Sequence, residues 1–300
     1  MWDLGALSLM PFRQPRHALK PHAFALDAAE QWALERASRL SADCFRLTSF
    51  WYIEYVRQHV PGERRTRYTM RLAQSENYGI ACGLVSPLRD TDYDLVGEDS
   101  REILNDRRFR DDLDRTALVD LVIGHVSAAA THQVILDQPL RDKYALRSRL
   151  VADEAEVVLR RKGLDAIKRS KPHILVIGAT AGMIGSLVTR GFEVTATDIS
   201  PDVVGQNLGG VTVRDETENG SLIRTADLVI ITGMTLPNRT LPAIIEACKN
   251  HNTSTMIWAI TGKNFGHYYT EQGVDCVMSD PSPFLLLPGP ASIGIWRREL

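Results

Sequence analysis

The sequence predicts an α/β protein: a Rossmann-like C-terminal domain with a parallel sheet, preceded by a smaller α+β domain. After residue 171, six short apolar runs alternate with helical or turn-rich stretches, the pattern of buried parallel strands joined by crossover helices. A charged amphipathic helix expected over residues 148–170 precedes these runs and separates them from a first half with a different sequence pattern. We therefore place the first domain at 1–147, the connecting helix at 148–170 and the Rossmann-like domain at 171–300.

The first half is expected to mix helices and strands. Residues 1–24 show no period and are interpreted as an irregular lead-in. The other expected elements are a helix over 26–40, a helix or a strand over 47–58, strands over 65–73 and 77–86, and an exposed charged helix over 100–114. The segment 117–135 is the most apolar one. We expect Gly124 and Ser127 to break it, with a following helix that Ser127 caps and Pro139 ends.

The second half opens with a strand, a glycine turn, a helix and a second strand that ends in an acid. The six expected strands are 173–177, 192–197, 211–213, 227–232, 255–260 and 274–278. Gly178 lets the chain leave the first strand sharply, Gly182 leaves room for a ligand near the main chain, and Gly185 lets the helix approach the sheet. The helix N-terminus favours an anion, and Asp198 stands where nucleotide sites hold ribose hydroxyls.

The glycine spacing is G-x-x-x-G-x-x-G, which is a weaker dinucleotide signal than G-x-G-x-x-G. Two interpretations stay open for the glycines, contact with a ligand or only a close strand–helix turn. Asp198 has a similar alternative, because the Ile-Ser-Pro-Asp after it is typical of a turn or a helix cap. The candidate cofactor contacts of this segment are Gly178, Ala179, Thr180, Gly182, Met183, Ile184, Asp198 and Ile199.

A second candidate loop follows the fourth strand, which should neighbour the first. Ligands of open α/β sheets lie outside the carboxyl ends of the strands, where the strand order reverses. The candidate contacts here are Thr232, Gly233, Met234, Thr235 and Asn238. The alternative is that Thr235 or Asn238 only caps a helix beginning near Leu241. The last loop, 280–290, is rich in proline, and we expect it to dock or pack rather than to close a pocket.

No catalytic residue or metal ligand can be assigned from the pattern. His125 and His132 are seven residues apart, too far for one metal ion without a third element, and His125 could also line a pocket. Cys82 is interpreted as a small apolar residue of a buried strand. No known hydrolase or phosphate-loop motif is present. Whether the chain is an enzyme therefore stays open.

Composition limits the partners and the compartment. The net charge of −2 gives no basic excess for nucleic acid, and no apolar run is long enough to span a bilayer. The start of the chain carries Asp3 and breaks at Pro11, which is untypical of a secretory signal. Four scattered cysteines fit a reducing compartment, so we expect a cytoplasmic protein. The apolar segment 117–135 could cover a homodimer interface or lie buried between domains.

The second half resembles the bacterial and archaeal proteins of the putative heavy-metal chelation domain family. The resemblance rests on the strand and turn of residues 176–185 and on residues 226–241, with Thr232-Gly233 and then Asn238-x-Thr240 before a helix. It covers roughly residues 120–290. It implies a Rossmann-like domain after a domain similar to the N-terminal domain of enolase, and a pocket at their junction that binds a metal or a metal chelate. No residue here matches a defined metal motif.

Three functions follow from these patterns. The first is a protein, or a biosynthetic enzyme, that binds a small anionic or metal-chelating molecule between the domains. The second is an S-adenosylmethionine-dependent enzyme, since residues 191–201 and 227–232 are similar to methyltransferase segments; the short chain after residue 260 argues against it. The third is an NAD(P)-dependent oxidoreductase, which the glycine spacing disfavours.

Overall fold

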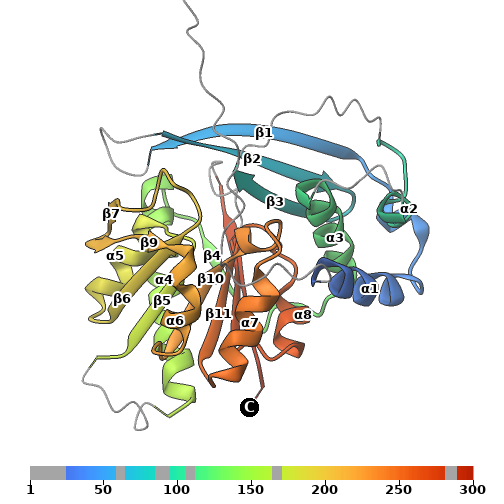
Figure 1. The fold of residues 1–300 in the computed structure, drawn as a ribbon. Coiled ribbons are helices and arrows are strands. Elements are labelled where there is room, and N and C mark those ends of the chain that lie inside the picture. The colour runs from blue at the N-terminus through green and yellow to red at the C-terminus, as the bar shows by residue number, and fades with distance from the viewer. Residues whose placement is uncertain are drawn as a thin grey trace, which may run out of the picture.

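The computed structural model of the protein describes residues 25–58, 65–84, 95–105, 112–163, 171–280 and 289–299. The expected lead-in 1–24 and most of the loop 280–290 lie outside this part. Within it, the chain forms a large mixed sheet flanked by helices, and a smaller antiparallel sheet that lies across one end of the large one (Figure 1). No helix in these ranges is both long and apolar enough to cross a membrane.

The large sheet has the strand order of a Rossmann fold. Its described strands run in the order β4-β13-β12-β11-β10-β5-β6-β9. Their bounds are β4 (His132–Leu136), β5 (His173–Ile177), β6 (Glu193–Asp198), β9 (Arg214–Asp215), β10 (Leu228–Thr232), β11 (Ser254–Ala259), β12 (Cys276–Ser279) and β13 (Ala291–Arg297). The six strands from β12 to β9 are parallel, and in chain order they follow 3-2-1-4-5-6. The predicted fold class is confirmed.

Alternate residues of the parallel strands enter two separate cores, as the period of a strand requires. Ile174 and Ile230 pack on one face of the sheet with α4 (Leu140–Arg161) and α5 (Ala181–Thr189). Leu175 and Ile231 pack on the other face. That face also receives α6 (Asn219–Ile223), α7 (Leu241–Asn250) and α8 (Gly266–Glu271). Both faces are therefore apolar, which is why these strands are continuous apolar runs.

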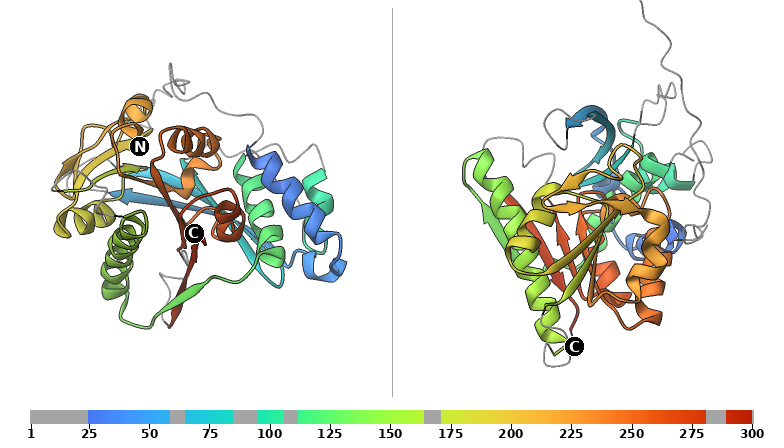
Figure 2. Two further views of the ribbon diagram at one scale, coloured as in Figure 1. Left: turned by 90° about the horizontal axis from the view of Figure 1, so that it is seen from below. Right: turned by 60° about the vertical axis from the view of Figure 1, so that its left-hand side comes forward.

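The first half contributes a three-stranded sheet and helices. Strands β1 (Ser49–Gln58), β2 (Arg65–Gln74) and β3 (Tyr78–Leu84) pair antiparallel in that order. The helices are α1 (Ala25–Ala37), α2 (Ser100–Asn105) and α3 (Asp112–Val126), with a short 3-10 turn η1 (Ala42–Phe45). Figure 2 shows α1 to α3 together on one side of the molecule, beside the large sheet.

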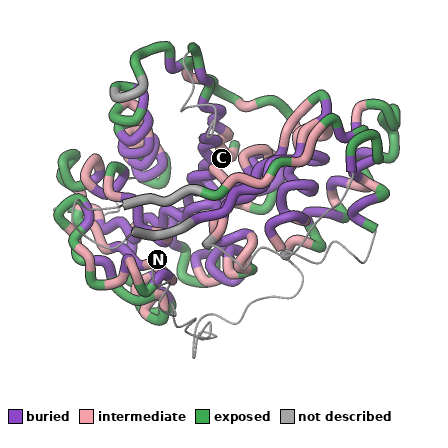
Figure 3. The backbone as a smooth tube through the Cα atoms, turned by 90° about the horizontal axis from the view of Figure 1, so that it is seen from above, coloured by how far each residue is buried: buried purple, intermediate pink, exposed green. Residues whose placement is uncertain are grey.

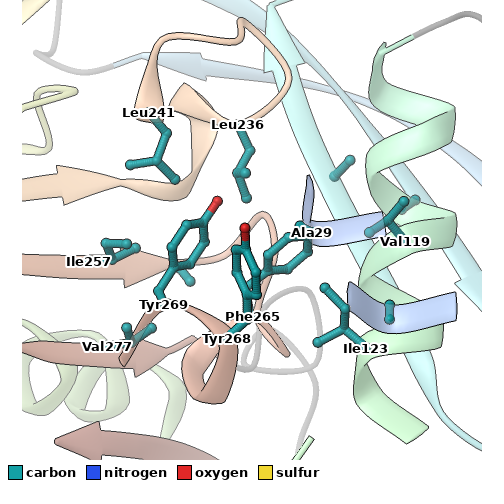
Figure 4. Packing of buried hydrophobic residues seen from close by; sticks show 14 of the residues in the cluster. Ala29, Val119, Ile123, Leu236, Leu241, Ile257, Phe265, Tyr268, Tyr269 and Val277 are labelled. Carbon is teal, nitrogen blue, oxygen red and sulfur yellow. The ribbon is translucent and has the colours of Figure 1, made fainter. Parts of the chain in front are cut away.

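The two halves share one hydrophobic core. The aromatic rings of Phe265, Tyr268 and Tyr269 pack toward α1 and α3, meeting residues such as Ala29 and Ile123 (Figure 4). Buried residues are concentrated in the central elements, and exposed residues lie at the periphery (Figure 3). Helix α3 is buried from residue 113 to residue 123 inside the chain itself. This burial fits one of the two explanations for the apolar segment, a helix buried between the two halves.

Several expected elements differ in the structure. Residues 117–126 belong to α3 and residues 132–136 form β4, so the helix expected after Ser127 is wrong. Residues 211–212 form β8 (Val211–Thr212) in a small hairpin with β7 (Asn207–Leu208), and the third parallel strand is β9 instead. Strands β4 and β13 were not expected. Strand β13 pairs antiparallel with β12 and β4, and β4 forms the edge of the sheet, where its exposed residues give only a weak apolar pattern.

The other helical expectations stand in part. The charged helix expected over 148–170 is α4, which begins earlier, at Leu140, and ends at Arg161; residues 164–170 lie outside the described part. The helix expected over 100–114 is two helices, α2 and the start of α3, and residues 106–111 between them are not described. The ambiguous segment 47–58 is a strand, β1.

Candidate functional site

The glycine turn and the Thr232 loop meet where the strand order reverses, as expected. Strands β5 and β10 are neighbours, and Gly178 has a φ of +90° that favours glycine. A Cβ at Gly178 would overlap the hydroxyl of Thr232. The missing side chain therefore makes room for the protein itself, which is an architectural reason for this glycine.

Of the other candidate contacts in the turn, Gly182 is exposed and the rest are buried. A Cβ at Gly182 would lie 2.8 Å from the Ser148 hydroxyl of α4. Met183 and Ile184 are fully buried in the core under α4 and α5. Ala179 and Thr180 are buried as well.

Asp198 holds the turn rather than projecting from it. One of its carboxylate oxygens accepts a hydrogen bond from the Ala179 N–H and the other accepts from the Ser200 N–H, each at 2.8 Å. The N–H of Ile199 also stabilises the carboxylate, while burial raises the pKa of the carboxyl. These bonds fit the alternative drawn from the sequence, in which Asp198 organises a turn.

The polar groups of the Thr232 loop bind within their own loop. The Thr235 hydroxyl donates to the carbonyl of Thr232 at 2.8 Å. The Asn238 side-chain oxygen accepts from the hydroxyl of Thr240 at 2.7 Å and from its N–H at 3.2 Å. Helix α7 begins at Leu241 as expected, with Thr240 before it. None of these hydrogen bonds needs a ligand.

The small sheet covers the carboxyl ends of β10 and β11, where a Rossmann fold usually binds its ligand. Met234, in the 3-10 turn η4 (Gly233–Thr235), packs against the apolar cluster of β2 and β3. The Thr261 hydroxyl accepts from the Cys82 N–H at 2.8 Å and donates to its carbonyl at 3.3 Å. Gly233 lies against the Thr261 carbonyl. Because the small sheet covers β10 and β11, the open space lies instead at the carboxyl edge beside β12 and β13.

A cavity of about 640 Å³ lies at that edge, between the two halves. Such a volume is typical of small-molecule sites. The residues that line it are Asn77, Tyr78, Gly124, Ser127, Ala128, Ala129, Ala130, Gln133, Lys263, Asn264, Ser279, Pro290, Ala291, Ser292, Gly294 and Trp296. They come from β3, from the end of α3 and the chain after it, from the segment after β11, and from β12 and β13. None of the sequence-predicted contacts is among them.

Lys263 is the only charged side chain among these lining residues of the described chain. Its Nζ lies 3.6 Å from the centroid of the Tyr78 ring, a cation–π contact. Burial lowers the pKa of Lys263 to about 8, although the carboxyl of Asp120 opposes that shift. In the described ranges Nζ forms neither a hydrogen bond nor an ion pair, and its contact is with the ring of Tyr78, which also lines the cavity.

Asp120 fixes the segment that carries Lys263. The carboxyl is fully buried and accepts hydrogen bonds from the N–H groups of Ile80 and Asn264, each at 2.8 Å, and from the main chain of Lys263. Burial raises the pKa of Asp120 to about 7. Asp120 therefore ties α3 to β3 and to the segment after β11, and it acts on the cavity as a positioning residue.

Asn264 and Gly124 complete this junction. The side-chain amide of Asn264 donates to the carbonyls of Tyr78, at 2.8 Å, and of Asp120, at 2.9 Å. A Cβ at Gly124 would lie 2.9 Å from that amide and would overlap the amide of Asn77. The glycine expected to break the apolar segment therefore lies inside α3, where it admits the side chains of the other half.

Sequence reasoning missed this junction, although signals for it exist. Asp120 is the one acid inside the apolar run 117–123, and an acid there has a special partner or role. Lys263 and Asn264 follow Thr261-Gly262 just after an apolar strand, at the carboxyl edge where ligands bind. The sequence does not show that Asp120 is bonded to Asn264, so the two signals could not be combined.

The described ranges hold no group of three or more His, Cys, Asp and Glu side chains placed to bind a metal ion. His125 shares a hydrogen bond of 2.9 Å with the Ser75 hydroxyl and stacks edge-on against Phe45. His132 lies on the edge strand β4. Although Gly124 lines the cavity, His125 does not. Cys82 is buried, as expected for a small apolar residue.

The comparisons with known proteins agree with the resemblance read from the residues. A family model described as putative heavy-metal chelation, DUF364, matches residues 164–259, which include the glycine turn and the Thr232 loop. The matched region ends just before Lys263. No curated protein matches the chain.

Two solved structures share the fold over most of the chain. One is a protein of unknown function from the DUF364 family of Pyrococcus horikoshii, 12% identical over 91% of this chain and 99% of that one, with a TM-score of 0.51. The other is a DUF364 family protein of unknown function from Desulfitobacterium hafniense DCB-2. It is 14% identical over 84% and 87% of the two chains, with a TM-score of 0.50. At these identities the likeness shows the fold alone.

Proposed function

Since residues 164–259 match the putative heavy-metal chelation family, we propose that this chain binds a small anionic, metal-chelating molecule in the cavity between its two halves. The observation that carries the proposal is Lys263. It places the single charge of the described lining, with three N–H donors, against the ring face of a second lining residue, Tyr78. A carboxylate or phosphate group of a ligand would satisfy these donors.

The neutral lining suits the rest of such a ligand. The hydroxyls of Ser279 and Ser292 and the amide of Gln133 can bond to further oxygens, while Trp296 and Pro290 offer apolar surface. Because the described side chains provide no three-ligand metal centre, we infer that a metal would enter already held by the ligand. The small molecule would then supply the groups that bind the metal, and the protein would bind the small molecule.

The two nucleotide alternatives have less support. An S-adenosylmethionine or NAD(P) site would use the glycine turn and Asp198, yet the carboxylate of Asp198 is bonded to its own turn and Gly182 packs against Ser148. The short chain after residue 260 was expected to lack the last antiparallel strands of a methyltransferase, yet an antiparallel strand, β13, follows residue 260. Its second neighbour is β4, from the first half, rather than a hairpin partner.

A thermal-shift and calorimetric screen tests the proposal. The probes are citrate, inorganic phosphate, nickel–citrate, nickel alone, S-adenosylhomocysteine and NADPH. A ligand at one hundred times its Kd adds about 2.7 kcal/mol of stability, which a melting curve resolves. We expect citrate or its nickel complex to stabilise the protein, and Lys263→Met to weaken that binding by about tenfold or more.

Lys249→Met is the matched control, because it removes the same charge from an exposed position of α7. It should bind the probes like the unaltered chain. Equal binding by Lys263→Met and the unaltered chain would contradict the proposal. Stabilisation by S-adenosylhomocysteine that Asp198→Ala abolishes would favour the methyltransferase-like alternative.

A further inference from the structure

Lys263 presents its amine from a rigid position. Its main chain is bonded to the buried carboxyl of Asp120. The N–H of Gly262 donates to the carbonyl of Ile80 at 3.0 Å, and the N–H of Asn264 donates to Asp120. The segment is thus fixed on both sides of the lysine by the N-terminal half. These bonds fix the main chain, so the side chain starts from a defined place at the cavity.

The environment of the amine favours its neutral form more than a surface position does. Burial lowers the pKa of Lys263 to about 8. At pH 7 this leaves about a tenth of the amines neutral, roughly two hundredfold more than for a lysine with the ordinary pKa. In the described chain no carboxylate lies within ion-pair distance of Nζ, and both Lys263 and its ring partner Tyr78 line the cavity. A partly dehydrated amine of this kind is a nucleophile for carbonyl groups.

We propose that Lys263 forms an imine with the carbonyl carbon of a small oxo acid in this cavity, a reaction that rests on the proposed function. The lone pair of Nζ attacks the carbonyl carbon while the π electrons of the carbonyl move to its oxygen. The two amine hydrogens then leave with that oxygen as one water molecule. One carbon–nitrogen double bond replaces the carbon–oxygen double bond, and the step needs no oxidant or reductant.

An oxo acid suits the cavity better than a neutral carbonyl compound does. Its carboxylate lies next to the reacting carbon, and therefore next to the ammonium of Lys263 on arrival and next to the protonated imine afterwards. The face of the Tyr78 ring stabilises the positive nitrogen in both states. The hydroxyls of Ser279 and Ser292 can receive the remaining oxygens. The same lysine thus first attracts the ligand and then binds it covalently.

Reductive trapping of the unaltered protein tests the inference. The protein is incubated with limiting glyoxylate and sodium cyanoborohydride, which reduces an imine of glyoxylate to a carboxymethyl-amine. Peptide mass spectrometry then gives the modified fraction at each lysine. We expect carboxymethylation of Lys263 to exceed that of the exposed Lys249 by about tenfold or more, because a neutral amine is the reacting species. In concentrated urea this preference should disappear.

Modification of Lys263 no faster than of Lys249 in the folded protein would overturn the inference. So would a preference that persists in urea, since it would not come from the cavity. Lys263→Arg separates this result from the proposed function, because arginine keeps the charge but forms no such imine. Citrate binding that survives in Lys263→Arg, together with no trapping at Lys263 in the unaltered chain, would leave the binding proposal standing and the imine refuted. Trapping at Lys263 without binding of any anion would support the imine and contradict the broader proposal.

Discussion

Replacing Asp120 by asparagine should remove a pH dependence from the stability of this protein. Burial raises the pKa of the Asp120 carboxyl from 3.8 to about 7. The folded protein therefore keeps a proton on this carboxyl over a range in which the unfolded chain has released it. A raised carboxyl pKa contributes stability that is fully present below about pH 4 and is lost as the pH rises through about 7.

The size of the effect follows from the protons bound in the two states. Between about pH 5 and pH 7 the folded state holds most of one extra proton, and one proton over one pH unit corresponds to 1.36 kcal/mol. The free energy of unfolding of the unaltered chain should thus fall, through Asp120 alone, by about 2 kcal/mol. Asp120→Asn cannot titrate, so its stability relative to the unaltered chain should rise by the same amount.

A constant cost is superimposed on this change. The two carboxylate oxygens accept from Ile80 and Asn264 separately, whereas asparagine keeps one oxygen. One buried N–H group then loses its acceptor, which costs about 1 to 3 kcal/mol at every pH. The variant should be the less stable protein near pH 5, and the margin should narrow to within about 1 kcal/mol of zero near pH 7.

Urea unfolding at a series of pH values from about 5 to 7, followed by circular dichroism, measures both terms. Asp43→Asn, the same substitution at an exposed side chain, controls for the change in net charge. A difference between Asp120→Asn and the unaltered chain that stays constant within about 0.5 kcal/mol over this range would refute the argument. It would mean that the carboxyl is already ionised near pH 5 despite its burial.

Three further substitutions test single features by urea unfolding. Thr261→Val should cost at least about 2 kcal/mol, since it leaves two main-chain groups of β3 without partners, and Thr261→Ser should recover most of it. Arg147→Met should cost about 3 to 5 kcal/mol, because Asp280 is fully buried and would lose the guanidinium at 2.9 Å; adding Asp280→Asn should reduce that loss. Gly178→Ala should cost clearly more than Gly191→Ala, since both have φ of +90° or more but only the first meets another side chain; equal costs would contradict the packing reason for Gly178.

Local patterns were sufficient for the centre of the C-terminal sheet. The run 173–177 is β5 to the residue, because a strand buried on both faces must be apolar throughout and a glycine turn must follow it. The neighbouring position of β10 also followed, from the connection rules of parallel sheets. The antiparallel strands β4 and β13 did not follow, since they pair with each other although they lie far apart in the chain, and β4 at the edge is largely exposed.

The candidate contacts were chosen by a rule that holds for the open edge of a Rossmann sheet. In this chain the small sheet covers that edge at β10 and β11, through Thr261 and Met234. The hydroxyls and amides of the Thr232 loop then bind inside the loop. The rule therefore leads to other strands than those beside the cavity, because it takes no account of what the first half covers.

The amino-acid sequence by itself determined the central strands β5, β6, β10, β11 and β12, the sharp turn at Gly178 and the family resemblance, since each depends on residues close together in the chain. Only the tertiary structure decided where the cavity lies and which side chain charges it. Asp120 and Asn264 are 144 residues apart, and their hydrogen bond exists only because α3 packs against the segment after β11. Contacts of this length come from the shape of two packed halves, and no local pattern encodes them.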